Sequence, residues 1–149
     1  MGTPSYSTIT DFPGHKNLGE KAMLFLMDAL YANDLVDDPL HLKWKITPFN
    51  DSWPASLFAS QDGVAIDSVS LDFLRSEWPH LADLSYSDDY MREAALADNP
   101  PSGTVYDPER DGTRCISLGV HEHWNNAADK KYSRNLGKKQ GIELYIGPT

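Results

Sequence analysis

The sequence predicts an α/β fold in which helices pack on a small sheet and long irregular loops join the elements. Three observations predict it. Residues 56–60 form a short, mainly apolar run, as in a buried strand. Residues 63–78 carry apolar side chains at spacings of three and four, as in a helix. Farther on, apolar and polar residues alternate over 115–124, as in a strand. This order of elements fits a single domain covering residues 1–149.

The two predicted helices have recognisable ends. Asp62 precedes the first helix and is a residue type that caps helix N-termini, and Pro79 stops that helix. A second helix is predicted over 88–98, with Ser87 as its cap and a proline pair after its end. Residues 141–146 form the last predicted strand.

Three segments are less regular in pattern. Residues 22–27 are an unbroken apolar run, and periodicity alone does not distinguish a buried strand from a helix there. Prolines concentrate in 34–54 and 99–112, which predicts loops. The polar residues 1–11 are expected to form a flexible N-terminal segment.

Charge and composition exclude several classes of partner. Thirteen basic and 22 acidic residues give a net charge of −9. Such a surface repels phosphate groups, so we expect no nucleic acid and no anionic membrane as the main partner. No run of about 18 apolar residues is present, so no membrane span is predicted. The first residues lack a signal-peptide pattern, which predicts a cytoplasmic protein if Met1 is the natural start.

Cys115 is the only cysteine in the chain. A disulfide within the chain, a multi-cysteine zinc site and an iron–sulfur cluster held by cysteines are therefore excluded. No histidine that could activate a thiol lies beside it in sequence. We expect Cys115 to be a small, buried apolar residue.

Three carboxylates are candidate catalytic residues. Asp62 and Asp67 lie where a predicted strand leads into a helix, and Asp28 closes the apolar run 22–27. If that run is a neighbouring strand, all three lie at one edge of the sheet, where ligands often bind in α/β folds. There they could hold a hard cation or transfer protons. The simpler interpretation is that Asp62 caps the helix and Asp67 complements its dipole.

Two histidines are candidate metal ligands. On a strand, His121 and His123 point to the same side about 6–7 Å apart, where both rings could reach one zinc, copper, iron or nickel ion. A third ligand and a partner for each remaining ring nitrogen would have to come from elsewhere. The alternative is a polar strand face whose histidines bind a neighbouring loop.

A candidate calcium site lies in the second proline-rich loop. Asp107, Glu109 and Asp111 occupy positions one, three and five of a calcium-loop pattern, and Gly112 follows at position six. The acidic residue expected at position twelve is missing, because Leu118 stands there. A tight turn at Asp111 and Gly112 is an alternative explanation of the same residues.

The aromatic residues allow a different function. Tryptophans and tyrosines could form a platform on which sugar rings stack, with Trp53 and Trp124 as its main members. In most proteins such residues belong to the core instead.

Several long phrases resemble the C-terminal half of domain of unknown function 362, a family often described as uncharacterised iron–sulfur centre proteins. They include Leu-Met-Asp-Ala-Leu-Tyr (26–31), Ser-Leu-Phe-Ala-Ser-Gln-Asp-Gly-Val-Ala-Ile-Asp (56–67) and Ser-Leu-Gly-Val-His-Glu-His-Trp-Asn-Asn (117–126). The later phrases are similar to a branch of the family that lacks the cluster. The resemblance covers about residues 12–144. Gly63 departs from the family's pattern, which has proline there.

The resemblance implies a strand over 22–27 that ends at Asp28, and half of a larger α/β domain. It supplies no activity, because the family has none agreed, and it implies no iron–sulfur cluster here. It also leads us to expect that the chain is part of a longer protein, as a truncated gene or a metagenomic reading frame would give. Such a piece could associate with itself as a homo-oligomer.

The leading functional hypothesis is a metal-dependent enzyme of the hydrolase type acting on a small molecule. His121 and His123 are its expected ligands for a divalent metal, with Asp28 or Asp62 as a further ligand or base. The alternatives are a non-catalytic carbohydrate-binding or accessory module, and a truncated family member that self-associates.

Overall fold

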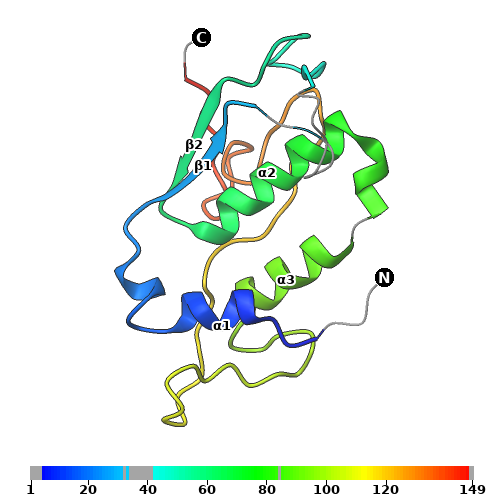
Figure 1. Cartoon of the computed structure of the whole chain (residues 1–149). Helices are drawn as coiled ribbons and strands as arrows, with labels where there is room; N and C mark the ends of the chain where they lie inside the picture. The colour runs from blue at the N-terminus through cyan, green and yellow to red at the C-terminus, as the bar shows by residue number, and fades with distance from the viewer. Residues whose placement is uncertain (1–4, 32, 34–41, 84, 148–149) are drawn as a thin grey trace.

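The computed structural model describes residues 5–31, 33, 42–83 and 85–147. Helix α2 packs between a two-stranded sheet and α3, and α1 contacts α3 (Figure 1). No helix in the described part of the chain is long and apolar enough to cross a membrane. The elements in chain order are α1 (Thr8–Gly14), η1 (Gly19–Lys21), β1 (Phe25–Ala29), β2 (Ser56–Ser60), α2 (Gly63–Glu77), η2 (Pro79–Asp83) and α3 (Ser85–Ala95).

The sheet confirms the prediction of a small α/β fold and gives its topology. Strand β1 pairs with β2 in antiparallel register, so that Phe25 lies opposite Ser60 and Asp28 opposite Leu57. The strand expected over 22–27 is therefore present but lies slightly later, and Asp28 lies near its C-terminal end, as expected. Because the pairing is antiparallel, the C-terminal end of β1 lies beside the N-terminal end of β2.

Helix α2 begins where its cap was expected. The Asp62 carboxylate accepts a hydrogen bond from the backbone N–H of Ala65 at 2.9 Å. The apolar side chains of α2 enter two different clusters, which explains why the helix is buried on more than one side. The first cluster joins the helix to the sheet side and the C-terminal loops: Trp44, Phe49, Ala65, Val69, Phe73, Tyr132 and Ile142. The second lies against α3: Val64, Leu71, Met91 and Ala94.

Cys115 is buried, as expected, in a third small cluster with Ala97 and Tyr106. This cluster closes the loop 99–112, which has no regular secondary structure, as predicted. The other predicted loop, 34–54, lies outside the described residues up to position 41. Its remainder folds around a bridge between Trp44 and Ser52.

The expected strands at 115–124 and 141–146 are wrong, because neither segment forms a strand. Both are held by groups other than a neighbouring strand. The backbone N–H of Leu118 donates to the Ala94 carbonyl of α3, and that of Val120 donates to the Asp62 carboxylate. In the last segment, the N–H of Leu144 donates to the Asn135 side chain. The backbone N–H groups of these segments bond to side chains and to the end of a helix instead of to a neighbouring strand.

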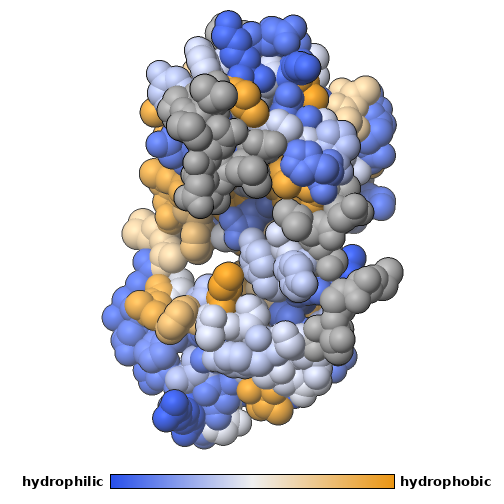
Figure 2. All heavy atoms as spheres, turned by 45° about the vertical axis from the view of Figure 1, so that its right-hand side comes forward, coloured by the Kyte–Doolittle hydropathy of each residue, from blue (hydrophilic) through white to orange (hydrophobic). Residues whose placement is uncertain are grey.

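Some apolar side chains reach the surface. Figure 2 shows several separate orange apolar patches among the blue hydrophilic atoms of this face. On the sheet, Leu26 of β1 and Leu57 of β2 are each more than half exposed, so only one face of the sheet is covered. The covered face carries Phe58, which packs against the core.

Candidate functional site

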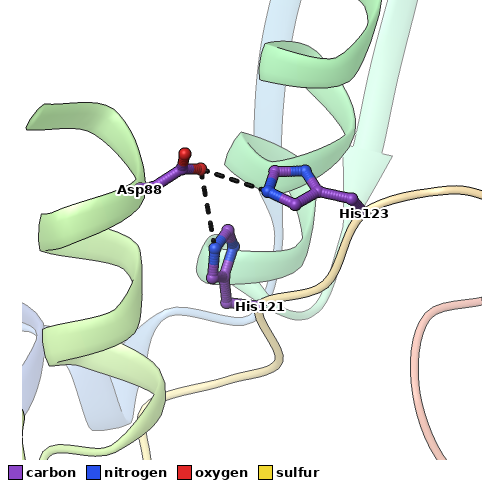
Figure 3. Close-up of side chains that lie close together, drawn as sticks. All are labelled: Asp88, His121 and His123. Carbon is purple, nitrogen blue, oxygen red and sulfur yellow. Dashed lines mark ion pairs between the residues drawn. The ribbon is translucent and has the colours of Figure 1, made fainter. Parts of the chain in front are cut away.

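Three side chains from two distant parts of the chain meet between α2 and α3. Asp88 comes from the first half of α3, and His121 and His123 come from an extended segment that runs past α2 (Figure 3). Backbone bonds at the two ends of this segment position the histidines, since Val120 is tied to Asp62 and Trp124 to Asp72. Alternation along the extended chain then turns both rings to the same side. The ring centroids are 5.1 Å apart and nearly perpendicular.

The distances between these side chains suit a metal ion. One Asp88 carboxylate oxygen lies 3.2 Å from Nε2 of His123 and 3.7 Å from Nε2 of His121. The three ligand atoms of the group all lie within 4.8 Å of one another. Ligands around a tetrahedral zinc, at about 2.0–2.2 Å from the ion, lie roughly 3.4 Å apart. The side chains therefore need only small rotations to surround one ion.

His123 is oriented by a buried carboxylate on its other nitrogen. Its Nδ1 lies 2.6 Å from the Asp72 carboxylate. The second oxygen of Asp72 accepts hydrogen bonds from the Tyr132 hydroxyl at 2.7 Å and from the Trp124 backbone at 3.0 Å. The hydrogen bond to Asp72 raises the pKa of His123. A carboxylate behind a histidine is the usual support of a metal ligand, and it leaves Nε2 directed toward Asp88.

His121 is oriented by Ser68 of α2. Its Nδ1 lies 2.9 Å from the Ser68 hydroxyl, which donates its own proton to the Val64 carbonyl at 2.8 Å. Because Ser68 occupies the Nδ1 side of the ring, Nε2 of His121 is directed toward Asp88. Burial, reinforced by the charge of His123, lowers the pKa of His121 to about 4.

Arg75 adds a positive charge to the same group. Its Nη1 lies 3.1 and 2.9 Å from the two Asp88 carboxylate oxygens. Arg75 and His123 thus lie directly against the two aspartates Asp88 and Asp72. The site thus holds two carboxylates that are both mostly buried in an environment already arranged for positive charge.

The three predicted catalytic aspartates are not brought together. Asp62 caps α2 and also accepts from Val120, while Asp28 lies at the opposite end of the sheet and accepts from the Leu30 backbone. Asp67 accepts a hydrogen bond from the Tyr90 hydroxyl, and burial raises the pKa of Asp67. The expectation of a shared sheet edge for Asp28 and Asp62 is wrong because it assumed parallel strands.

The candidate calcium ligands do not converge either. Both oxygens of Asp107 accept backbone hydrogen bonds, from Asp111 and Gly112. The Glu109 carboxylate pairs with Lys16 at 2.8 Å. Asp111 accepts from the backbone of Thr113. These contacts are those of a tight turn closed by an ion pair.

Sequence reasoning found the two histidines but missed their partners. Asp88 was expected only as the first residue of the predicted helix 88–98, and Asp72 and Ser68 were not predicted as site residues. A signal for the latter exists: Ser68, Asp72 and Arg75 follow one another at spacings of four and three on α2. They form a polar stripe between the apolar side chains that enter the two clusters, which is unusual on a helix buried on both sides.

Comparisons with protein-family models, curated proteins and solved structures found no match to this chain. The resemblance to domain of unknown function 362 therefore stays a prediction.

Proposed function

We propose that the protein binds one divalent transition metal through Asp88, His121 and His123, and that it is a metal-dependent hydrolase of small molecules. The observation that carries the proposal is the support behind the ligands. Asp72 and Ser68 each occupy the Nδ1 side of one histidine, so that both Nε2 atoms are directed toward the same Asp88 oxygen. This is the arrangement expected of ligands prepared for an ion.

The donor set favours a particular class of metal. Two imidazole nitrogens and one carboxylate oxygen suit zinc or iron(II) better than calcium or magnesium, which prefer oxygen ligands. Three protein ligands leave a coordination position for water, as in catalytic sites. That open position would lie beside His123, because the side chain of His123 is 39% exposed whereas that of His121 is 7% exposed. The open position would face solvent on the His123 side.

A metal at this position would supply hydrolytic chemistry by lowering the pKa of a bound water to about 7. The chain contributes the rest of the environment. Asp72 orients His123, and Arg75 beside Asp88 is a positive group that favours a substrate with developing negative charge.

The same residues include a serine, a histidine and an aspartate, but they do not favour a serine nucleophile. Ser68 has no exposed surface, and its proton is bound to the Val64 carbonyl. A nucleophile must reach the substrate, so metal-assisted hydrolysis is the better interpretation.

The carbohydrate-binding alternative has weaker support. Trp124 packs edge-on against Phe73 with ring centroids 5.0 Å apart and is partly buried against the core. Trp53 packs edge-on against Tyr31 with ring centroids 5.4 Å apart, so neither of the two rings is a separate flat platform.

Metal uptake by purified protein tests the binding part of the proposal. We expect about one equivalent of zinc or iron(II) by calorimetry and elemental analysis, and none in a protein with His121→Ala and His123→Ala. His80→Ala, an exposed histidine outside the group, is the matched control and should bind as the wild type does. Equal uptake by the double variant would overturn the site.

Hydrolysis of a panel of nitrophenyl carboxylic and phosphoric esters tests the catalytic part. Activity should disappear with a chelator and return with the metal that calorimetry identifies. A protein that binds the metal but hydrolyses none of these esters faster than free metal would leave a metal site without the proposed activity.

A further inference from the structure

A long cavity lies beside the free edge of β2. Its volume is about 820 Å³, and one of its walls is the whole of β2. The opposite wall is the extended segment 142–147, and the floor is the apolar face of α2 with Ala65, Val69 and Phe73. The cavity therefore has the boundaries of a missing strand: a strand on one side, an extended chain on the other, and a helix beneath.

The edge of β2 that faces away from β1 carries backbone N–H and C=O groups that are not paired with another strand in the described residues. The N–H of Ala55 donates to the Leu30 carbonyl, which makes 30 and 55 a hydrogen-bonded pair. Pairs alternate along an antiparallel ladder, so Leu57 and Ala59 also bond to β1. The backbone groups of Ser56, Phe58 and Ser60 consequently point away from β1 and into the cavity. In the described part of the chain, β2 pairs with β1 alone.

The charge of the cavity indicates what would fill it. Glu143 is the sole charged residue among the described residues that line it, in a chain of net charge −9. An uncharged segment with apolar side chains toward α2 matches these walls, and a charged one would be buried without a partner. Five residues of β2 fix the length of such a strand at about 16 Å.

We propose that this cavity is a docking site for one uncharged, extended strand of another polypeptide, which adds to the sheet between β2 and residues 142–147. Main-chain bonds to Ser56, Phe58 and Ser60 would hold it, and apolar side chains at alternate positions would cover the floor. The site is separate from the metal group, which lies on the α3 side of α2.

Peptide binding tests the proposal directly. The probe is a seven-residue peptide of alternating threonine and valine, blocked at both ends and labelled for fluorescence anisotropy. A peptide with proline in place of the central valine is its control, because proline lacks the N–H that the ladder needs. We expect saturable binding of the first peptide and at least tenfold weaker binding of the second. Equal affinities, or no binding of either, would overturn the proposal.

A pair of protein variants tests the edge itself. Ser60→Pro and Ser60→Ala both remove the hydroxyl that accepts from the Asp62 backbone, but only proline also removes an outward N–H. Ser60→Ala should bind the peptide within about twofold of the wild type, and Ser60→Pro at least tenfold more weakly. Equal binding by the two variants would contradict strand addition.

Amide hydrogen exchange gives a readout that does not depend on variants. Saturating peptide should slow exchange at Phe58 and Ser60 at least tenfold and leave Leu57 and Ala59 unchanged, because the latter already bond to β1. Sedimentation of the protein alone tests a different occupant. A dimer that protects Phe58 and Ser60 without peptide would show that a second copy fills the cavity, and would overturn our choice of another polypeptide.

Discussion

Single buried carboxylates organise much of this molecule by accepting several hydrogen bonds each. Asp72 is hydrogen-bonded to His123, to the Tyr132 hydroxyl and to the Trp124 backbone. Glu93 accepts hydrogen bonds from the Tyr106 hydroxyl and from both the backbone and the hydroxyl of Ser102. The two networks are alike in chemistry, but only the first adjoins the candidate metal ligands. This similarity gives a matched pair of variants.

Tyr132→Phe should weaken both folding and metal binding. It removes one donor to Asp72, which costs about 1–2 kcal/mol of unfolding free energy. It should also reduce metal affinity about tenfold, because Asp72 then holds His123 less firmly. Tyr106→Phe removes the equivalent bond to Glu93 and is the control. It should lower the midpoint of urea unfolding similarly and leave the calorimetric metal affinity unchanged. A metal affinity lowered equally in both variants would contradict a specific role for Asp72.

His121 should make the metal-free protein less stable in acid. Its pKa is lowered to about 4 in the folded state, so the unfolded chain takes up the proton first as the pH falls. This destabilises the fold below pH 6.5, and by about 2 kcal/mol between pH 8 and pH 5. His121→Gln removes this titration. The free energy of unfolding should therefore fall less over that range in the variant, measured by urea unfolding at each pH. An equal fall in both proteins would be the contrary result.

At the scale of elements, local signals were sufficient where an element depends on its own sequence. Strand β2, helix α2 and the Asp62 cap follow from apolar spacing and capping chemistry, and all three were predicted. The apolar run 22–27 was ambiguous by periodicity, and only the family resemblance favoured a strand. The segments 115–124 and 141–146 alternate like strands but form none. An alternating pattern specifies an extended chain, whereas a strand also requires a partner edge.

The Asp62 carboxylate joins two elements, and a series of variants can separate its two bonds. One oxygen caps α2 through Ala65, and the other accepts from Val120. Asp62→Ala loses both and should cost about 2–3 kcal/mol. Asp62→Asn keeps one oxygen for the cap but places an amide against Val120, and should cost roughly half as much. Equal losses in the two variants, measured by urea unfolding, would show that the capping bond to Ala65 contributes nothing.

At the scale of the whole molecule, the sequence predicted the histidine pair but not the complete group of candidate metal ligands with Asp88. His121 and His123 share a side on any extended segment. Their partners Asp88, Asp72 and Ser68 are set by how α2 and α3 pack, and that packing is a property of the tertiary fold. Asp28 and Asp62, which were expected at one edge of the sheet, are separated by the antiparallel pairing of β1 and β2.

Metal binding should stabilise the whole fold. A ligand that binds only the folded state adds about 2.7 kcal/mol at a concentration one hundred times its Kd. For a chain of 149 residues this corresponds to a rise in Tm of about 5–10 °C. The variant with His121→Ala and His123→Ala should show no rise under the same conditions in a thermal melt. A rise of the same size in that variant would show that the ion acts elsewhere.

The proposed ligands stand at positions 88, 121 and 123, and the tyrosine that supports them stands at 132. During synthesis the ribosome releases these residues in that order, so the last of them emerges long after α2 and α3 have been made. A nascent chain that ends before residue 121 lacks two of the three donors and cannot capture the ion. Loading with metal would thus mark a chain whose translation has passed this point and whose residues 120–124 have already packed against α2.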